Sequence, residues 1–371
     1  MFKRIAAMKV LVLAPMVRIA MRLYLQRLLD EADASGADVT LIAPSHVDVS
    51  TRFPIVRMGG GGKWAVAWAQ VNPLTFLRIA MTMLRGRFDM VHVINGENRP
   101  MVLWTLLLAR MLGMRGLVTI HDPLPHPCAR LEVATYKLGL VARRLASELN
   151  IHDKAHLDVV DDGSGKPVHV FPLPDMSKSF PKAAVFRKER EVLFFGRMEP
   201  YKGIDHFVDL GLRMRGAARF ILAGGGNVPD DLLATMHANP DVFTVENRYI
   251  SDDEMIAFMD RAKVALLPYH SATQSAVPPV ASARGAISIG FAVGGLVNQI
   301  PALGGVVVPS GDMDALEAAV RDGLAMDEAA LFHLTTLPDP FEDAVHQLYG
   351  PARAGKSSGK PSAKIAPVVI A

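Results

Sequence analysis

Residues 192–203 read VLFFGRMEPYKG: four apolar residues run through a glycine into a loop that carries an arginine and a lysine. A short, continuous apolar run fits a strand buried on both faces, as in a parallel sheet. The glycine lets the chain turn sharply off that strand, and a helix is expected from Gly203. The stretch therefore predicts the strand–loop–helix unit from which doubly wound α/β domains are built.

The same unit recurs in both directions along the chain. Before it, strands are expected at 9–13, 38–42, 90–93 and 116–120, with helices over 19–34 and 101–112. After it, strands are expected at 219–223, 242–245, 264–267, 287–289 and 305–308, with helices near 230–238, 251–260, from 312 and up to 349. Ser251 and Glu254 have the spacing of a capping box. This order predicts an α/β fold of two Rossmann-like, doubly wound domains facing a central cleft.

The length supports two domains, because one apolar core stops growing near roughly 250–300 residues and the chain has 371. Residues 171–181 (FPLPDMSKSFP) have the composition of a linker. We expect a first domain over 1–172, a second over 173–340 and a C-terminal helical segment over 341–350. The Ser/Gly/Lys/Pro-rich tail over 351–371 is expected to be disordered.

Charge is divided unevenly between the halves. The whole chain has 40 Lys and Arg against 37 Asp and Glu, a net charge of +3. Residues 1–150 hold 19 basic and 10 acidic residues, whereas the remainder holds 21 and 27. The 50% hydrophobic content excludes a mostly disordered chain. The single cysteine, Cys128, excludes a disulfide framework and a Cys-rich zinc site.

No stretch reaches the roughly 18–20 apolar residues that a membrane-spanning helix needs. The opening MFKRIAAMKVLVLAP has a basic start and an apolar run, as a signal peptide does, but Lys9 interrupts the run. The same residues also fit a buried first strand. The strand interpretation is favoured, and it predicts a cytoplasmic protein.

Two cations follow the strand at 192–195. Arg197 and Lys202 lie at the carboxyl end of the predicted sheet, where open α/β sheets bind ligands. Beside a helix N-terminus, an arginine fork and a lysine charge can hold a diphosphate; a solvated loop is the alternative. The glycine turn at 224–226 lets backbone approach a ligand, although it is not a GxGxxG fingerprint. Hydroxyl and amide side chains suited to phosphate oxygens follow Pro268, at Ser271, Thr273, Gln274 and Ser275.

The order of these motifs over residues 9–349 resembles the family 4 glycosyltransferases, retaining enzymes of the two-Rossmann GT-B type. The resemblance implies a diphosphate site, a glycine turn lining the donor site, a backbone segment that holds the base, and a histidine against the transferred sugar. In this sequence these positions are Gly196, Arg197, Lys202 and Gly203; Gly224 and Gly225; Arg248, Tyr249 and Ile250; and His121.

The sequence departs from the family at one motif. The family usually has two glutamates eight positions apart between a strand-ending proline and a glycine, here Pro268 and Gly285. The two positions are Ala272 and Val280, so the usual contacts to the sugar and the ribose are missing. The segment SATQSAV resembles instead a subset with a Thr-Gln-Ser turn, in which Thr273, Gln274 and Ser275 would face the diphosphate. A degenerate, inactive copy is the alternative.

No His/Cys/Glu cluster at metal-ligand spacing appears in the sequence, so a reaction without metal or cofactor is expected. Positive side chains and helix N-termini would offset the departing diphosphate. The resemblance implies retention without an obligatory enzyme nucleophile, with His121 orienting the donor sugar; a histidine that only ends a strand is the alternative. Glu97, Asn98 and His126 are candidates for acceptor contacts.

Basic and apolar residues alternate in the first half, in RIAMRLYLQRLL (18–29) and in residues 63–87 with Trp64, Trp68 and Phe76. Such segments bind anionic membrane surfaces; ordinary core-facing helices with basic outer faces are the alternative. Nucleic-acid binding fits less well, because no recognised module is present.

The favoured function is transfer of a hexose from a nucleotide-diphospho-sugar, with UDP favoured over GDP, to a carbohydrate or polyprenyl-linked acceptor. Surface polysaccharide synthesis at the inner face of the cell membrane would suit this reaction. The alternatives are a nucleotide-sugar epimerase of the same fold, which would want acid–base carboxylates, and an inactive nucleotide-binding partner of a polysaccharide complex.

Overall fold

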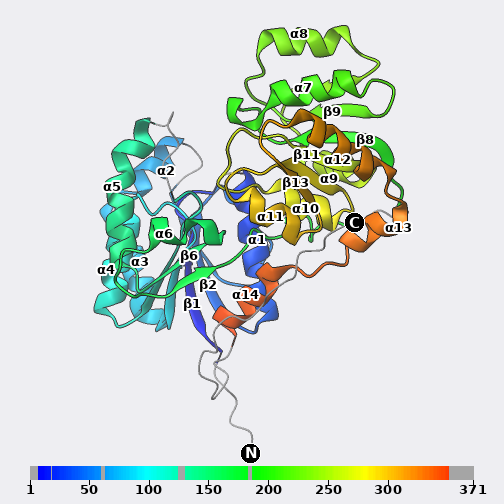
Figure 1. Ribbon diagram of the computed structural model, residues 1–371. Helices are drawn as coiled ribbons and strands as arrows, with labels where there is room; N and C mark the ends of the chain where they lie inside the picture. The colour runs from blue at the N-terminus through cyan, green and yellow to red at the C-terminus, as the bar shows by residue number, and fades with distance from the viewer. Residues whose placement is uncertain (1–6, 18, 60–62, 124–129, 183–185, 351–371) are drawn as a thin grey trace, which may run out of the picture.

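Two parallel β-sheets, each covered by helices, make up the molecule (Figure 1). The computed structural model describes residues 7–17, 19–59, 63–123, 130–182 and 186–350. The predicted tail over 351–371 and His126 lie outside the described residues. The predicted α/β fold of two doubly wound domains is confirmed.

The first sheet has seven strands in the order β3-β2-β1-β4-β5-β6-β7, and the second has six in the order β10-β9-β8-β11-β12-β13. In both sheets the chain winds outward from a central pair, β1/β4 and β8/β11, where ligands bind in such folds. The strands are β1 (Lys9–Leu13), β2 (Asp38–Pro44), β3 (Ile55–Met58), β4 (Met90–Val93), β5 (Arg115–Thr119), β6 (Glu148–Ile151), β7 (Val168–Val170), β8 (Glu189–Phe195), β9 (Arg219–Ala223), β10 (Phe243–Glu246), β11 (Ala262–Leu267), β12 (Ile287–Phe291) and β13 (Val306–Val308).

Helices connect the strands and cover both sheets. They are α1 (Ile19–Ala34), α2 (Lys63–Ala69), α3 (Pro73–Gly86), α4 (Pro100–Met111), α5 (Arg130–Leu145), α6 (Leu157–Val160), α7 (Ile204–Arg213), α8 (Asp230–Ala238), α9 (Asp252–Arg261), α10 (Val277–Ala283), α11 (Leu296–Ala302), α12 (Met313–Ala325), α13 (Glu328–Leu334) and α14 (Pro340–Tyr349), with short 3₁₀ turns η1 (Lys154–His156) and η2 (Pro200–Lys202).

Local sequence explains most of these elements. The central strands are continuous apolar runs because helices bury both sheet faces: four of the five residues of β1 are buried. The predicted capping box is confirmed, since the Ser251 hydroxyl accepts from the Glu254 N–H and the Glu254 carboxylate accepts from the Ser251 N–H. Asp312 caps α12 in the simpler one-sided way.

Several elements were not expected from the sequence. Strands β3, β6 and β7 have only four, four and three residues, and only β6 is wholly buried. Helices α5, α6, α10, α11 and α13 also have no counterpart among the predicted ranges, whereas α2 and α3 fall within the amphipathic segment at 63–87. The predicted helix and strand limits otherwise differ by one or two residues at most ends, where hydrogen bonding frays.

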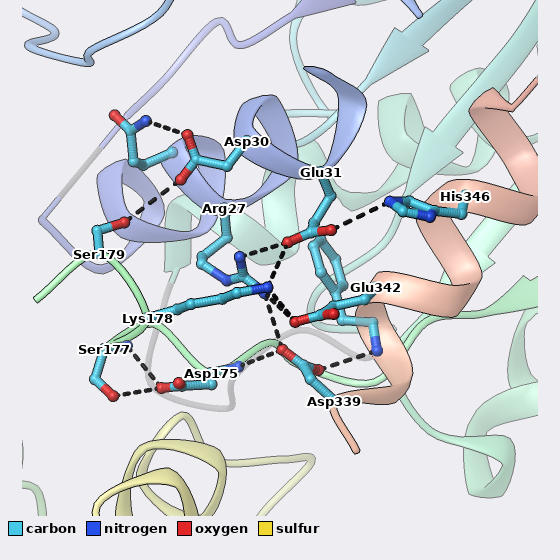
Figure 2. A network of polar contacts seen from close by, with 12 residues as sticks. Arg27, Asp30, Glu31, Asp175, Ser177, Lys178, Ser179, Asp339, Glu342 and His346 are labelled. Carbon is cyan, nitrogen blue, oxygen red and sulfur yellow. Dashed lines mark hydrogen bonds and ion pairs between the residues drawn. The ribbon is translucent and has the colours of Figure 1, made fainter. Parts of the chain in front are cut away.

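The chain crosses between the two sheets twice. Residues 171–182, between β7 and β8, form the first crossing and contain no helix or strand. After α13 the chain returns and α14 packs on α1 of the first domain (Figure 1). In Figure 2, Glu31 of α1 pairs with Lys178 of the first crossing, and Arg27 of α1 pairs with Glu342, which follows the second. One polar network thus joins α1 to both crossings.

Candidate active site

The loop over residues 196–203, called the clamp loop here, leaves the carboxyl end of the central strand β8. Lys202 is buried, with its Nζ 5.2 Å from the centre of the Tyr269 ring. The same Nζ lies 2.8 Å from the point where a Cβ on Gly196 would sit. Arg197 is exposed and ion-paired to Glu199, with Nε 3.0 Å from Oε1. The loop therefore holds one buried lysine and one exposed arginine.

Two glycines allow the neighbouring backbones to close on the clamp loop. Gly203 has φ of +70°, and a Cβ there would lie 1.9 Å from the Pro268 oxygen. Gly224 has φ of +143°, and its Cβ would lie 1.9 Å from the Gly196 oxygen. No other residue fits either position, because the clash is with backbone and the left-handed conformation disfavours a side chain. The ends of β8, β9 and β11 are thereby brought together.

The predicted base-binding segment lies between β10 and α9. Gly225 packs against the Arg248 backbone, with its Cβ position 3.1 Å from the Arg248 carbonyl carbon. The Arg248 side chain is ion-paired to Glu246 and Glu254. Tyr249 is exposed, whereas Ile250 is buried. The segment therefore offers backbone groups and an exposed tyrosine ring beside the glycine turn.

The turn over residues 273–275 follows β11 and reaches across to the first domain. Thr273 Oγ1 donates to Asp122 Oδ1 at 3.1 Å, and Gln274 Nε2 donates to the His121 carbonyl at 2.8 Å. Ser275 is used internally: its hydroxyl accepts from Val277 N–H, and its backbone pairs with the Gln299 amide. The Ser275 hydroxyl thus acts as an acceptor at the start of α10, a contact that does not use its own hydrogen.

His121 follows β5, at the carboxyl edge of the first sheet. Both ring nitrogens are engaged by protein atoms: Nε2 lies 2.7 Å from the Ile94 oxygen and Nδ1 lies 2.8 Å from His152 Nε2. Burial lowers the pKa of His121 below its ordinary value. A sugar contact through either nitrogen would therefore replace a protein contact.

Glu97 and Asn98 lie between β4 and α4. Glu97 Oε1 is 3.7 Å from Arg143 NH2, and burial raises the pKa of the Glu97 carboxyl. Both side chains lie beside Gly139 of α5. The structure therefore brings them to the first sheet's carboxyl edge, near Asp122, rather than to the clamp loop.

Three residues that sequence spacing did not connect meet beside the clamp loop. Asp205, His206 and His270 each offer a ligand atom, and these atoms lie within 4.8 Å of one another. His270 Nε2 is 3.1 Å from Asp205 Oδ1. The set has the ligand types of a transition-metal site. Residue 270 is distant in sequence from the other two, so no motif could have revealed it.

A cavity of about 680 Å³ lies behind the 273–275 turn. Asp153 and Asn298, joined at 3.1 Å, form part of its wall. Both chain crossings line it as well, through Phe180 and Leu337 among others. The cavity is therefore lined by residues of both domains and of both crossings.

The two positions of the family glutamates occupy different surroundings. Ala272 is half-buried, and its oxygen accepts from the Gly295 N–H at 3.3 Å. Val280 is buried in α10. Neither residue can supply a carboxylate, so donor contacts here would have to come from other groups.

Comparisons with known proteins agree with this fold. Residues 189–325 match the family model described as Glycosyl transferases group 1. Sucrose-phosphate synthase from Thermosynechococcus elongatus is 18% identical with a TM-score of 0.62, covering 92% of this chain and 95% of that chain. HepE of Anabaena in complex with UDP and glucose is 12% identical with a TM-score of 0.61, covering 92% and 96%. The lipopolysaccharide outer core galactosyltransferase WaaB is 12% identical with a TM-score of 0.62, covering 92% and 98%.

No curated protein sequence gives a significant match. The two facing sheets define the class as a protein of the GT-B fold. The family match lies within the second domain, and over the rest of the chain the likeness to glycosyltransferases is one of fold.

Proposed function

We propose that this protein transfers a hexose, with retention of anomeric configuration, from a nucleotide-diphospho-sugar to a carbohydrate or polyprenyl-linked acceptor. UDP is favoured over GDP as the carrier, and surface polysaccharide synthesis is the favoured setting. The observation that carries the proposal is the buried Lys202, whose Nζ lies where a side chain on Gly196 would begin, together with the exposed Arg197 of the same loop.

The chemistry follows from charge. As the bond between the sugar carbon and the diphosphate breaks, Lys202 and Arg197 offset the charge that develops on the leaving oxygen. The acceptor oxygen bonds to the same carbon from the same face. Its proton passes to the departing diphosphate. The N-terminus of α7, directly after Gly203, adds to the positive potential.

The test is binding of UDP-glucose to the double variant Arg197→Ala with Lys202→Ala. We expect a loss of at least about 100-fold in affinity, since each hydrogen bond to a charged group contributes about 1.5–3 kcal/mol. The matched control is Arg215→Ala with Arg321→Ala, two exposed cations of the same domain. Undiminished binding by the double variant would refute the clamp assignment.

Two other functions give different outcomes. An epimerase would convert the nucleotide sugar without any acceptor. An inactive partner would bind the nucleotide and transfer nothing when acceptors are supplied. The absence of carboxylates at Ala272 and Val280 disfavours the epimerase.

We further propose that the first domain docks on an anionic membrane surface. Helices α2 and α3 expose large apolar side chains: Trp64 (90% exposed), Trp68 (62%), Leu74 (68%), Leu77 (58%) and Leu84 (53%). Met111 at the end of α4, which packs against α3, adds to them. Exposed Arg78 and Arg85 lie on α3 among these residues. Apolar anchors beside cations fit a surface of anionic lipid. In the part of the chain that the structure describes, no helix is long and apolar enough to cross a bilayer.

Co-sedimentation with vesicles tests this docking. The protein should bind vesicles with anionic lipid more strongly than neutral ones, and Trp64→Ser with Trp68→Ser should reduce binding. Phe332→Ser is the control, because Phe332 is half-exposed but belongs to the second domain. Equal binding to neutral vesicles, or no effect of the tryptophan changes, would contradict the proposal.

A further inference from the structure

Two histidines of the first domain lie in a chain of three short polar contacts that ends at a backbone carbonyl on each side. The Ile94 oxygen is 2.7 Å from His121 Nε2, and His121 Nδ1 is 2.8 Å from His152 Nε2. His152 Nδ1 is in turn 2.6 Å from the Phe171 oxygen. His152 is buried, and the two ring centres are 4.6 Å apart.

The three contacts need three hydrogens on the two imidazole rings. A carbonyl oxygen only accepts, so His121 Nε2 and His152 Nδ1 must both carry hydrogen to bond to their carbonyls. The contact between the rings needs a third hydrogen. Two neutral imidazoles carry only two. All three contacts are therefore satisfied only when the pair holds one extra proton and one positive charge.

A third buried histidine provides the contrast. His92 lies between the Tyr349 hydroxyl and Thr119 Oγ1, with its ring nitrogens within 2.7 Å of both. A hydroxyl can donate as well as accept. Neutral His92 is therefore satisfied at both ends and needs no extra proton. The carbonyl partners, not burial, distinguish the His121–His152 pair.

Two contacts join the pair's surroundings to the 273–275 turn of the second domain. The Gln274 side chain binds the His121 backbone, and Thr273 binds Asp122, the next residue. Phe171, at the other end, begins the first crossing between the domains. The titratable groups around the rings are Tyr24 of α1, which meets both edge-on, His92 of β4, and Asp122 and Asp153, which follow His121 and His152 in sequence.

We propose that His121 and His152 form one site for a single extra proton, filled when the diphosphate of a nucleotide sugar binds, and that His152 is a positioning residue for His121. The location of the anion rests on the proposed function; the proton requirement does not. The proton comes from solvent and becomes the third N–H of the pair. Burial lowers the pKa of both histidines in the free protein, and a bound anion opposes that effect.

Calorimetry measures this proton directly. UDP-glucose is the probe, because both its phosphates remain ionised between pH 6 and 8. Titrations in two buffers of different ionisation heat should show uptake approaching one proton per ligand bound. Because the complex holds more protons, the affinity should rise as the pH falls, by up to tenfold per pH unit.

Two variants distinguish proton uptake by this pair from proton uptake by other groups. His152→Asn should bind UDP-glucose with little proton uptake and a flatter pH profile. His92→Asn, a matched buried histidine, should keep the wild-type uptake. No uptake by the wild-type protein, or equal uptake by His152→Asn, would overturn the proposal.

Nuclear magnetic resonance of the free protein with labelled histidines tests the pair without any ligand or variant. As the pH falls, both rings should shift together with one midpoint as a single proton enters. Two separate midpoints, or no shift before the protein unfolds, would overturn the pair. If UDP-glucose does not bind to the wild-type protein while the common midpoint is observed, only the donor proposal fails.

Discussion

Replacing Arg27 by alanine should destabilise the protein strongly. Arg27 is 1% exposed, although it carries a full charge. Its guanidinium lies 2.7 Å from Glu31, 3.1 Å from Asp339 and 3.4 Å from Glu342. Figure 2 draws these contacts between α1 and α14. The alanine variant would leave the buried Glu31 and the partly buried Asp339 without this partner and would loosen α14 from α1.

The burial of Arg27 determines how much free energy of unfolding the alanine variant should lose. Removing one member of a buried ion pair costs about 3–5 kcal/mol. Glu31 keeps Lys178 and His346 as partners, so we expect about 3 kcal/mol. At about 2–4 °C per kcal/mol for a domain of this size, the unfolding temperature should fall by about 6–12 °C.

The assay is thermal unfolding followed by circular dichroism, with Arg52→Ala as control. Arg52 also pairs with an aspartate of α1, Asp33, but its side chain is 62% exposed. An exposed pair contributes at most about 1 kcal/mol, so the control should shift by a few degrees at most. Equal shifts for the two variants would refute the reasoning.

The pH dependence adds a second check. Burial by itself would raise the pKa of Glu31, but hydrogen bonds from Lys178 and Arg27 outweigh it and lower the pKa. Because the folded value is below the unfolded one, this stabilisation is present above the unfolded value of 4.5 and is lost as the pH falls through the folded value. The difference between wild type and Arg27→Ala should therefore narrow in acid.

Three further changes test other parts of the structure. Burial alone would raise the pKa of Glu148, but hydrogen bonds from His169 and Arg115 lower it to about 2. Glu148→Gln should therefore lower the unfolding temperature at pH 7, and this difference from wild type should disappear as the pH falls from 4.5 to 2. Burial lowers the pKa of Lys188 to about 7 from 10.5. Between pH 7 and 10.5 the folded protein has lost this proton, whereas the unfolded chain keeps it. The free energy of unfolding from denaturant titrations should therefore rise from pH 7 to 10.5 in wild type but not in Lys188→Met. Gly224→Ala should lower both the unfolding temperature and UDP-glucose affinity, because its Cβ would lie 1.9 Å from a clamp-loop oxygen; an unchanged protein would contradict that packing.

Local pattern predicted the parts of the fold that depend on neighbouring residues. The central strands were found because burial on both faces makes them continuous apolar runs. The capping box of α9 was found because its two bonds join residues three apart. Strand β7 was missed because three half-buried residues carry no periodic signal, and it forms only by pairing with β6.

The candidate site likewise combines features that the sequence reveals with contacts that it does not. The clamp loop is continuous in sequence, so its glycines and cations could be recognised from the order of residues alone. The role of Ser275 could not, because Gln299, which occupies its backbone, is supplied by another helix. Nor could the pairing of Asp205 with His270 be seen from their spacing.

By itself, the sequence determined the two α/β domains, their order and the position of the clamp loop after β8, since each depends on residues close together in the chain. The tertiary structure alone decided that His121 meets His152, that Arg27 pairs with Asp339, and that the 273–275 turn reaches the first domain. The physical reason is that parallel sheets bring the carboxyl ends of distant strands to one edge. Contacts across that edge join residues whose separation in sequence carries no information about their distance in space.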